Sequence, residues 1–95
     1  MERKVGNVRR REEFTGPAEL ARFFRGERLD AIPARSVDRT AVLVHILGLF
    51  ERGCDYSEGD VNLVLARVHN DFATLRRYLI DAGLLARERG RYRRV

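Results

Sequence analysis

A chain of 95 residues has room for one small hydrophobic core, because two cores of half that length would each bury too little surface to offset the loss of chain entropy. The composition, 44% hydrophobic and 35% charged, excludes a fibrous repeat, and no apolar run approaches the roughly 18 residues that cross a bilayer, so we expect no membrane contact. Lys and Arg number 19 against 14 Asp and Glu, and the net charge of +5 favours an anionic partner, either nucleic acid or an acidic protein surface.

The basic residues and the single cysteine bear on which partners and ligands the protein can bind. Lys4 is the only lysine, so arginine dominates, either because guanidinium groups bind phosphates and guanine edges or because the genome favours arginine codons. Cys54 has no second cysteine to pair with, and the cysteine and the two histidines are too scattered to form a zinc site. No apolar signal-peptide stretch occurs near the N-terminus. We therefore expect a cytoplasmic protein without metal or cofactor.

The first third of the chain predicts a basic arm and one short helix. Residues 1–14 combine several arginines with few apolar residues, which is typical of a flexible arm. Pro17 suits the first turn of a helix, with Thr15 or the glycine after it as the cap, and Gly26 suits the end of that helix. The residues that follow predict either a loop or one short strand. The segment 15–35 is therefore expected to be an N-terminal helix and a connecting segment.

The middle of the chain predicts three helices. Ser36 is the N-cap candidate of the first helix, which spans about fourteen residues with apolar side chains at helical spacing. Ser57 and Asp60 resemble a capping box at the start of the second helix. A short turn then leads to a third helix over 71–82, which is capped by its first residue and stopped by Gly83. Two helices joined by so short a turn form a helix-turn-helix.

The last residues predict a β-hairpin. A strand over 84–88 is followed by a turn at Arg89 and Gly90, where glycine supplies the positive φ that a tight hairpin needs, and a return strand ends at Val95. Three helices followed by a hairpin is the order of a winged helix. We predict a mainly α protein with a small β-hairpin wing, a winged helix-turn-helix over 36–95.

The third predicted helix has one apolar and one polar face. Its apolar stripe comprises Phe72, Leu75, Tyr78, Leu79 and Ala82. The opposite face carries small and basic residues in its N-terminal half, the half with which a recognition helix reaches base edges in the major groove. Arginines of the wing would bind phosphates. The predicted DNA-binding residues are Ala73, Thr74, Arg76 and Arg77 of the helix and Arg87, Arg89, Arg91, Arg93 and Arg94 of the wing.

Charge is unevenly distributed along the chain. Residues 1–35 carry a net charge of +3, residues 36–70 carry −2, and residues 71–95 carry +4. Positive charge is therefore concentrated in the arm, the last helix and the wing, and the last two are where a winged helix would meet DNA.

Two resemblances to known families bear on these predictions. The strings IPAR, YSEGDVN, DFATLRRYLIDAGLLARE and RYRR resemble an uncharacterised bacterial domain of unknown function, found alone or fused to helix-turn-helix transcriptional regulators. That resemblance implies a winged-helix fold and no established activity. Separately, TLRR followed by leucine and GLL-x-R is similar to the recognition helix of DeoR-type repressors, which implies that Thr74, Arg76 and Arg77 face DNA. Here the helix is about one turn shorter than in those repressors, and Tyr78 replaces an acidic residue.

Two functions follow as hypotheses. The first is a small DNA-binding transcriptional regulator that contacts duplex DNA through the helix 71–82 and the wing 84–95. The alternative is a protein–protein interaction or dimerisation module with a homodimer or an acidic protein as partner, favoured by Ile80 among the exposed positions and by the adjacent Phe23 and Phe24. An enzyme is not expected, because no activated nucleophile or glycine-rich phosphate loop is found.

Overall fold

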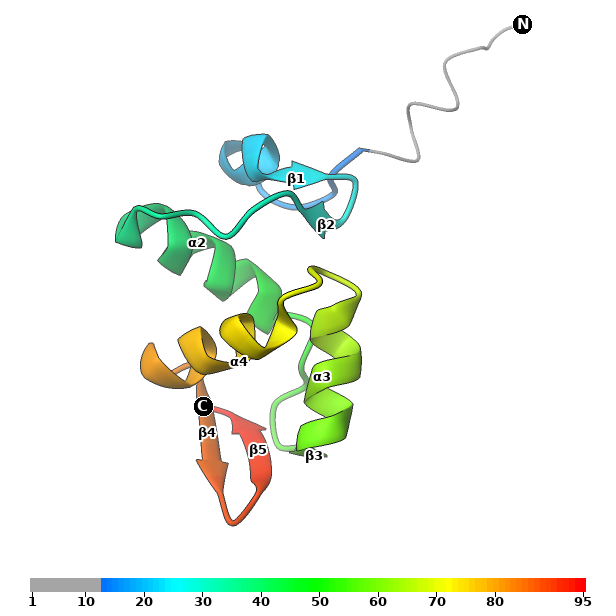
Figure 1. Cartoon of the computed structure of the whole chain (residues 1–95), viewed down its shortest axis with the longest axis vertical. Helices are drawn as coiled ribbons and strands as arrows, with labels where there is room; N and C mark the ends of the chain where they lie inside the picture. The colour runs from blue at the N-terminus through cyan, green and yellow to red at the C-terminus, as the bar shows by residue number, and fades with distance from the viewer. Residues whose placement is uncertain (1–12) are drawn as a thin grey trace, which may run out of the picture.

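In the computed structural model, which describes residues 13–95, the chain is a mixed α/β protein with helices and two small antiparallel sheets (Figure 1). The predicted arm over residues 1–14 lies outside the described residues except for its last two. In chain order the elements are η1 (Ala18–Phe23), β1 (Phe24–Arg25), β2 (Arg28–Leu29), α2 (Ser36–Leu47), β3 (Asp55–Ser57), α3 (Glu58–Ala66), α4 (Phe72–Asp81), β4 (Leu85–Glu88) and β5 (Arg91–Arg94).

The N-terminal segment differs from its prediction. The helix after Pro17 is a 3₁₀-helix, and the residues after it form a short hairpin, β1–β2, where the sequence predicts a helix end and at most one strand. Gly26 has a φ of 61° in the turn of this hairpin. Thr15 does not cap η1, because its backbone N–H and its hydroxyl both donate to Glu27 Oε2 at 2.8 Å. These contacts hold the chain before η1 against the hairpin turn.

The helix α2 packs one apolar face into the core and is shorter than predicted. It buries Val42, Leu43, Ile46 and Leu47. The predicted cap, Ser36, is instead the first residue of the helix, and the N-cap position belongs to Arg35, which makes no side-chain cap. The helix ends at Leu47 because the next three N–H groups bond to carbonyl groups three residues earlier, which tightens the chain into turns.

The next two helices start as the sequence predicts, and α4 also stops where the sequence predicts. At α3, Ser57 accepts from the Asp60 N–H while the Asp60 carboxylate accepts from the Ser57 N–H, which confirms the capping box. At α4, Asp71 Oδ1 accepts from the Thr74 N–H at 3.3 Å. The helix ends before Gly83, whose φ of 75° is the left-handed conformation typical of a helix stop.

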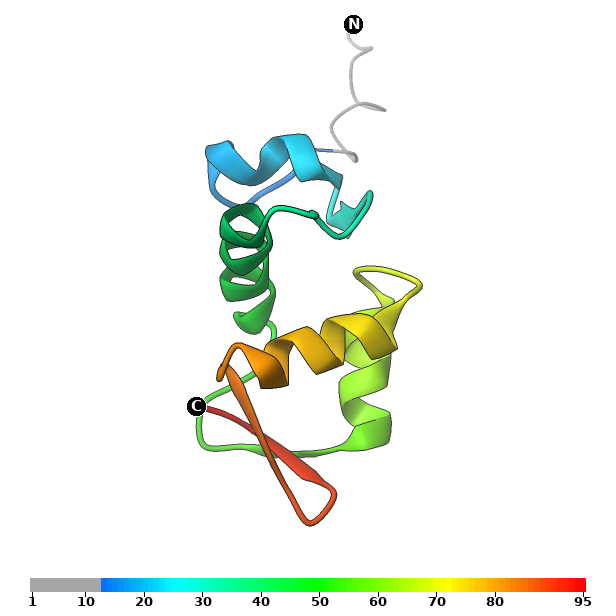
Figure 2. The ribbon, with the colours of Figure 1, turned by 60° about the vertical axis from the view of Figure 1, so that its left-hand side comes forward.

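The C-terminal hairpin, β4–β5, forms as predicted and gains a third strand. The sheet order is β3-β5-β4, so β3, the segment before α3, pairs with the last strand. The turn has φ values of 55° at Arg89 and 77° at Gly90, the two successive positive values of a type I′ turn. Figure 2 shows this hairpin at one end of the molecule, with η1 and the β1–β2 hairpin at the other.

One core joins these elements. It includes Leu29 of β2, Leu65 of α3 and Tyr92 of β5. In α4 the predicted apolar stripe is only partly buried: Leu75 and Leu79 are fully covered, Phe72 and Tyr78 are half-buried, and Ala82, the C-cap residue, is exposed. Within residues 13–95, no helix has both the length and the apolar character needed to cross a membrane.

Candidate nucleic-acid interface

A shallow groove runs between α4 and the C-terminal hairpin. Its volume is about 350 Å³, and we call it the α4–hairpin groove. Of the predicted DNA-binding residues, it brings together Ala73, Arg76, Arg77 and Arg87. The remaining lining residues are Glu58, Ile80, Asp81 and Tyr92. The helix α4 and the strand β4 thus both contribute arginine to the α4–hairpin groove.

Two of the arginines in the groove are exposed. Arg77 comes from the solvent face of α4, and Arg87 comes from β4. The Arg87 guanidinium lies over the Tyr92 ring, 5.9 Å from its centre. No ion pair found within residues 13–95 involves either side chain. Both guanidinium groups can therefore meet an anionic ligand without first breaking an ion pair inside the described part of the chain.

The other two predicted residues of the α4 surface have different environments. Arg76 is half-buried, and its Nη1 donates to Asn62 Oδ1 of α3. That bond holds Arg76 on the α3 side of the groove. Thr74 is also half-buried and does not line the groove, although its backbone N–H completes the cap of α4. The sequence pattern identified the face of the helix but not the extent to which α3 covers it.

The floor of the groove contains a hydrogen bond that the sequence did not predict. Tyr92 is 2% exposed, and its hydroxyl donates to Glu58 Oε1 at 2.9 Å. Burial, and after it the hydrogen bond to Glu58, raises the pKa of the Tyr92 phenol above its usual value. The phenol is therefore neutral at pH 7 and joins β5 to the first residue of α3. The ring of Tyr92 packs inward, against the core.

The remaining wing arginines lie on two different faces of the sheet. Arg89, Arg91 and Arg93 line a second hollow of about 320 Å³ on the outer face, together with Asp55 and Glu88. Arg93 forms an ion pair with Asp55, with its Nη2 2.8 Å from Oδ1. Successive side chains of a strand point to opposite faces, so these residues face away from Tyr92.

Arg94 is a structural residue. It is half-buried, and its Nη1 donates to the carbonyl oxygens of Phe50 at 3.0 Å and Leu47 at 3.5 Å. Its Nε is buried and has no hydrogen-bond partner among the described residues. The guanidinium therefore binds the carbonyl groups at the C-terminal end of α2, where a positive charge is stabilised. Alternation along β5 turns Arg94 toward the core side, and the DNA contact that the sequence predicts for it stays a prediction.

The profile of one protein family, described as uncharacterised proteins conserved in bacteria (DUF2087), matches residues 28–94. The chain belongs to the DUF2087 family. This confirms the resemblance to an uncharacterised bacterial domain. The DUF2087 region begins in β2 and ends in β5, so it includes the whole α4–hairpin groove and leaves out η1 and β1. No curated protein and no solved structure matches this DUF2087 chain.

Arg28, the first residue of the DUF2087 match, connects the N-terminal hairpin to the turn between α3 and α4. Its Nη1 donates to the carbonyl oxygens of Ala66 and Arg67, both at 3.1 Å, and its Nη2 donates to Asn70 Oδ1 at 3.0 Å. The Leu29 N–H also donates to the Val68 carbonyl at 2.8 Å. The N-terminal hairpin is thus fixed to the turn that precedes α4.

Proposed function

We propose that the chain is a winged helix-turn-helix protein that binds duplex DNA and acts as a transcriptional regulator. The order α2, β3, α3, α4, β4, β5, with β3 paired to β5, supports the winged-helix assignment. In this proposal α3 and α4 are the helix-turn-helix, α4 is the recognition helix, and the C-terminal hairpin is the wing.

The observation that carries the proposal is the convergence of Arg77 and Arg87 on the α4–hairpin groove. Arg77 lies on the exposed face of the recognition helix, where a guanidinium can donate two hydrogen bonds to guanine O6 and N7. Ala73, one turn earlier, is small and exposed, and it allows α4 to approach the bases closely. Arg87 at the side of the groove is placed for a phosphate next to the bases that Arg77 contacts.

The wing supplies further phosphate contacts from its tip. Arg89 in the turn and Arg91 beside it are exposed. Arg93 contributes less, because Asp55 already neutralises it. With about four arginines on phosphates, the logarithm of the affinity falls with the logarithm of the salt concentration at a slope of roughly −4.

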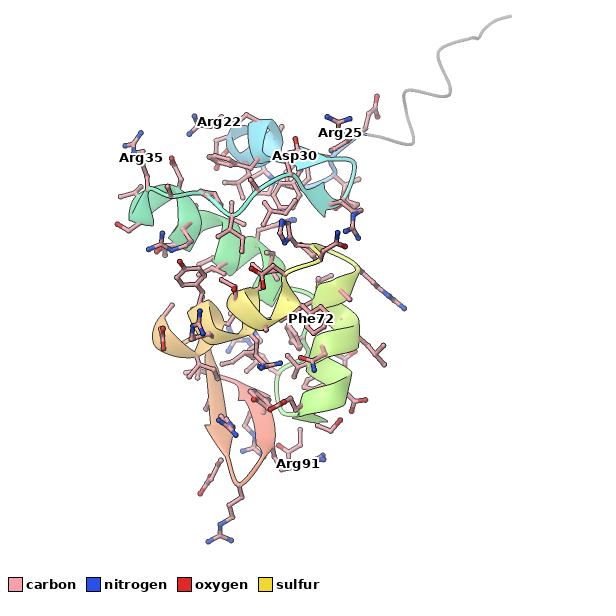
Figure 3. The ribbon with its side chains drawn as sticks, in the orientation of Figure 1. Arg22, Arg25, Asp30, Arg35, Phe72 and Arg91 are labelled. Atoms are coloured by element: carbon pink, nitrogen blue, oxygen red, sulfur yellow. The ribbon has the colours of Figure 1, made fainter. Side chains whose placement is uncertain are left out.

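A pair of double variants tests this function. We expect Arg77→Ala with Arg87→Ala to weaken binding to duplex DNA at low salt by about 30-fold or more, since each contact is worth about 1–3 kcal/mol. Arg22→Ala with Arg35→Ala is the matched control, because it removes the same charge from the opposite end of the molecule, as Figure 3 shows for Arg22, Arg35 and Arg91. An equal loss of affinity in the two double variants would show that DNA binding depends on net charge alone. Unchanged affinity in the Arg77→Ala, Arg87→Ala variant would rule the proposal out.

The features that favoured an interaction module in the sequence are used within the fold. Ile80 packs against the core at the edge of the groove. Phe24 is buried, and Phe23 packs against the core with the Arg22 guanidinium 4.4 Å from its ring centre. Support for an interaction surface therefore has to come from another part of the molecule.

A further inference from the structure

The outward face of α2 is an unbroken apolar stripe. Val37, Ala41, Val44 and Gly48 follow one another at spacings of four, three and four residues, so they form one line along the helix, which we call the outer stripe. Val37 is 71% and Val44 is 54% exposed, while Ala41 and Gly48 are also exposed. The line lies about 170° around the helix from the buried Ile46. None of its residues is polar.

A neighbouring hollow widens this apolar surface. It has a volume of about 310 Å³ and lies between the outer stripe and η1. Its lining is mostly apolar, with Pro17 and Leu20 on one side and Ala41 and Val44 on the other, and it also includes Glu19 and His45. Leu49, just beyond the stripe, is 52% exposed. Contiguous exposed apolar surface of this kind marks a site of association rather than ordinary solvent-facing helix.

The sizes of the residues in the stripe indicate what covers it. Large and small residues alternate as Val37, Ala41, Val44 and Gly48. When a second α2 lies antiparallel to the first, Val37 faces Gly48 and Val44 faces Ala41, so every large side chain meets a small one. A parallel copy would set valine against valine and leave gaps at the small residues. The surface therefore complements itself in the antiparallel direction only.

We propose that two copies of this chain associate through an antiparallel pair of α2 helices, with the two-fold axis passing between Ala41 and Val44. Because the outer stripe carries no charge, an identical copy meets no repulsion there and a strongly acidic or basic partner finds nothing to bind. The stripe also points away from α4, which packs on the other side of α2, where the Arg39 guanidinium lies 4.6 Å from the centre of the Tyr78 ring. The pairing leaves the α4–hairpin groove uncovered and does not depend on DNA binding.

Sedimentation velocity of the full chain over a wide concentration range tests the proposal. One helix pair is at the low end of specific interface sizes, so we expect half-association on the order of tens of micromolar. Val44→Asp should stay monomeric at concentrations where the wild type is dimeric. Leu63→Asp is the matched control, because Leu63 is 71% exposed on α3, outside the stripe, and it should dimerise like the wild type. Circular dichroism checks that each variant folds.

A second experiment tests the direction of the pair. In a Cys54→Ser background, chains carrying Ala41→Cys are mixed with chains carrying Val44→Cys. The antiparallel register brings position 41 of one copy close to position 44 of the other, within the roughly 7 Å between Cα atoms that a disulfide spans. We expect the mixed disulfide to form at least several-fold faster than either like pair. A wild type that stays monomeric at several hundred micromolar, equal effects of the two aspartates, or faster coupling of 41 to 41 would overturn the proposal.

Discussion

The two hairpins of the molecule are both antiparallel, but different forces hold them. The N-terminal hairpin has strands of two residues each, and contacts with the rest of the chain stabilise it: Thr15 binds its turn, and its own Arg28 binds the turn before α4. The C-terminal hairpin has strands of four residues, a third strand alongside and a buried tyrosine. Both hairpins make contacts with distant residues, but the turn and the strand length of the second can be predicted from its local sequence, whereas those of the first cannot.

The largest expected effect concerns the C-terminal hairpin. Tyr92→Ala should lower the free energy of unfolding by about 3–5 kcal/mol, because it leaves a cavity between β5 and α3. Tyr92→Phe keeps the ring and removes only the hydroxyl that binds Glu58, so it should cost about 1 kcal/mol. Urea denaturation measures both. An equal loss of stability in the two variants would show that the hydrogen bond to Glu58, and not the packing of the ring, supplies the stabilisation.

The next effect concerns the N-terminal hairpin. Arg28→Ala should cost about 1–2 kcal/mol and increase amide exchange in β1–β2, because the guanidinium makes hydrogen bonds to two carbonyl groups and to Asn70. Arg25→Ala in the same hairpin removes only an exposed ion pair with Asp30 and should cost less than about 1 kcal/mol. If amide exchange in Arg28→Ala increases only at the ends of the chain, the pairing of β1 with β2 is enough to hold the hairpin without Arg28.

A smaller effect should appear at high pH. The raised pKa of Tyr92 means that above pH 10.0, the ordinary value, the unfolded chain loses this proton while the folded chain retains it. The stability that Tyr92 supplies is thus fully present below that pH and is lost as the pH rises through the raised pKa. Urea denaturation between pH 8 and 11 should show a steeper decline for the wild type than for Tyr92→Phe. Parallel declines would contradict the assignment.

The smallest effect concerns the turn of the C-terminal hairpin. Arg89 has a φ of 55°, a conformation that asparagine tolerates better than arginine. Arg89→Asn should therefore stabilise the chain by about 0.5 kcal/mol, and thermal unfolding measures the gain. Arg91→Asn, beside the turn in extended backbone, is the control and should give no such gain. A destabilised Arg89→Asn would indicate that the arginine side chain itself holds the turn.

Features that depend on neighbouring residues were predictable. The capping box of Ser57 and Asp60, the cap at Asp71 and the stop at Gly83 each involve groups within a few residues, and all are confirmed. The hairpin turn at Gly90 belongs to the same class. A competing partner can prevent a predicted cap: Thr15 binds Glu27 and does not cap η1.

What the sequence by itself determined is the order of the last three helices and the C-terminal hairpin, and the face of α4 that carries arginine. Only the tertiary structure decided the role of each arginine. Arg77 and Arg87 reach a shared groove, Arg76 is held by Asn62 on α3, and Arg94 binds carbonyl groups at the end of α2. The partners of Arg94 lie more than forty residues away in the chain. Helical and strand periodicity predict a side chain's direction, but a long-range partner appears only when the elements pack.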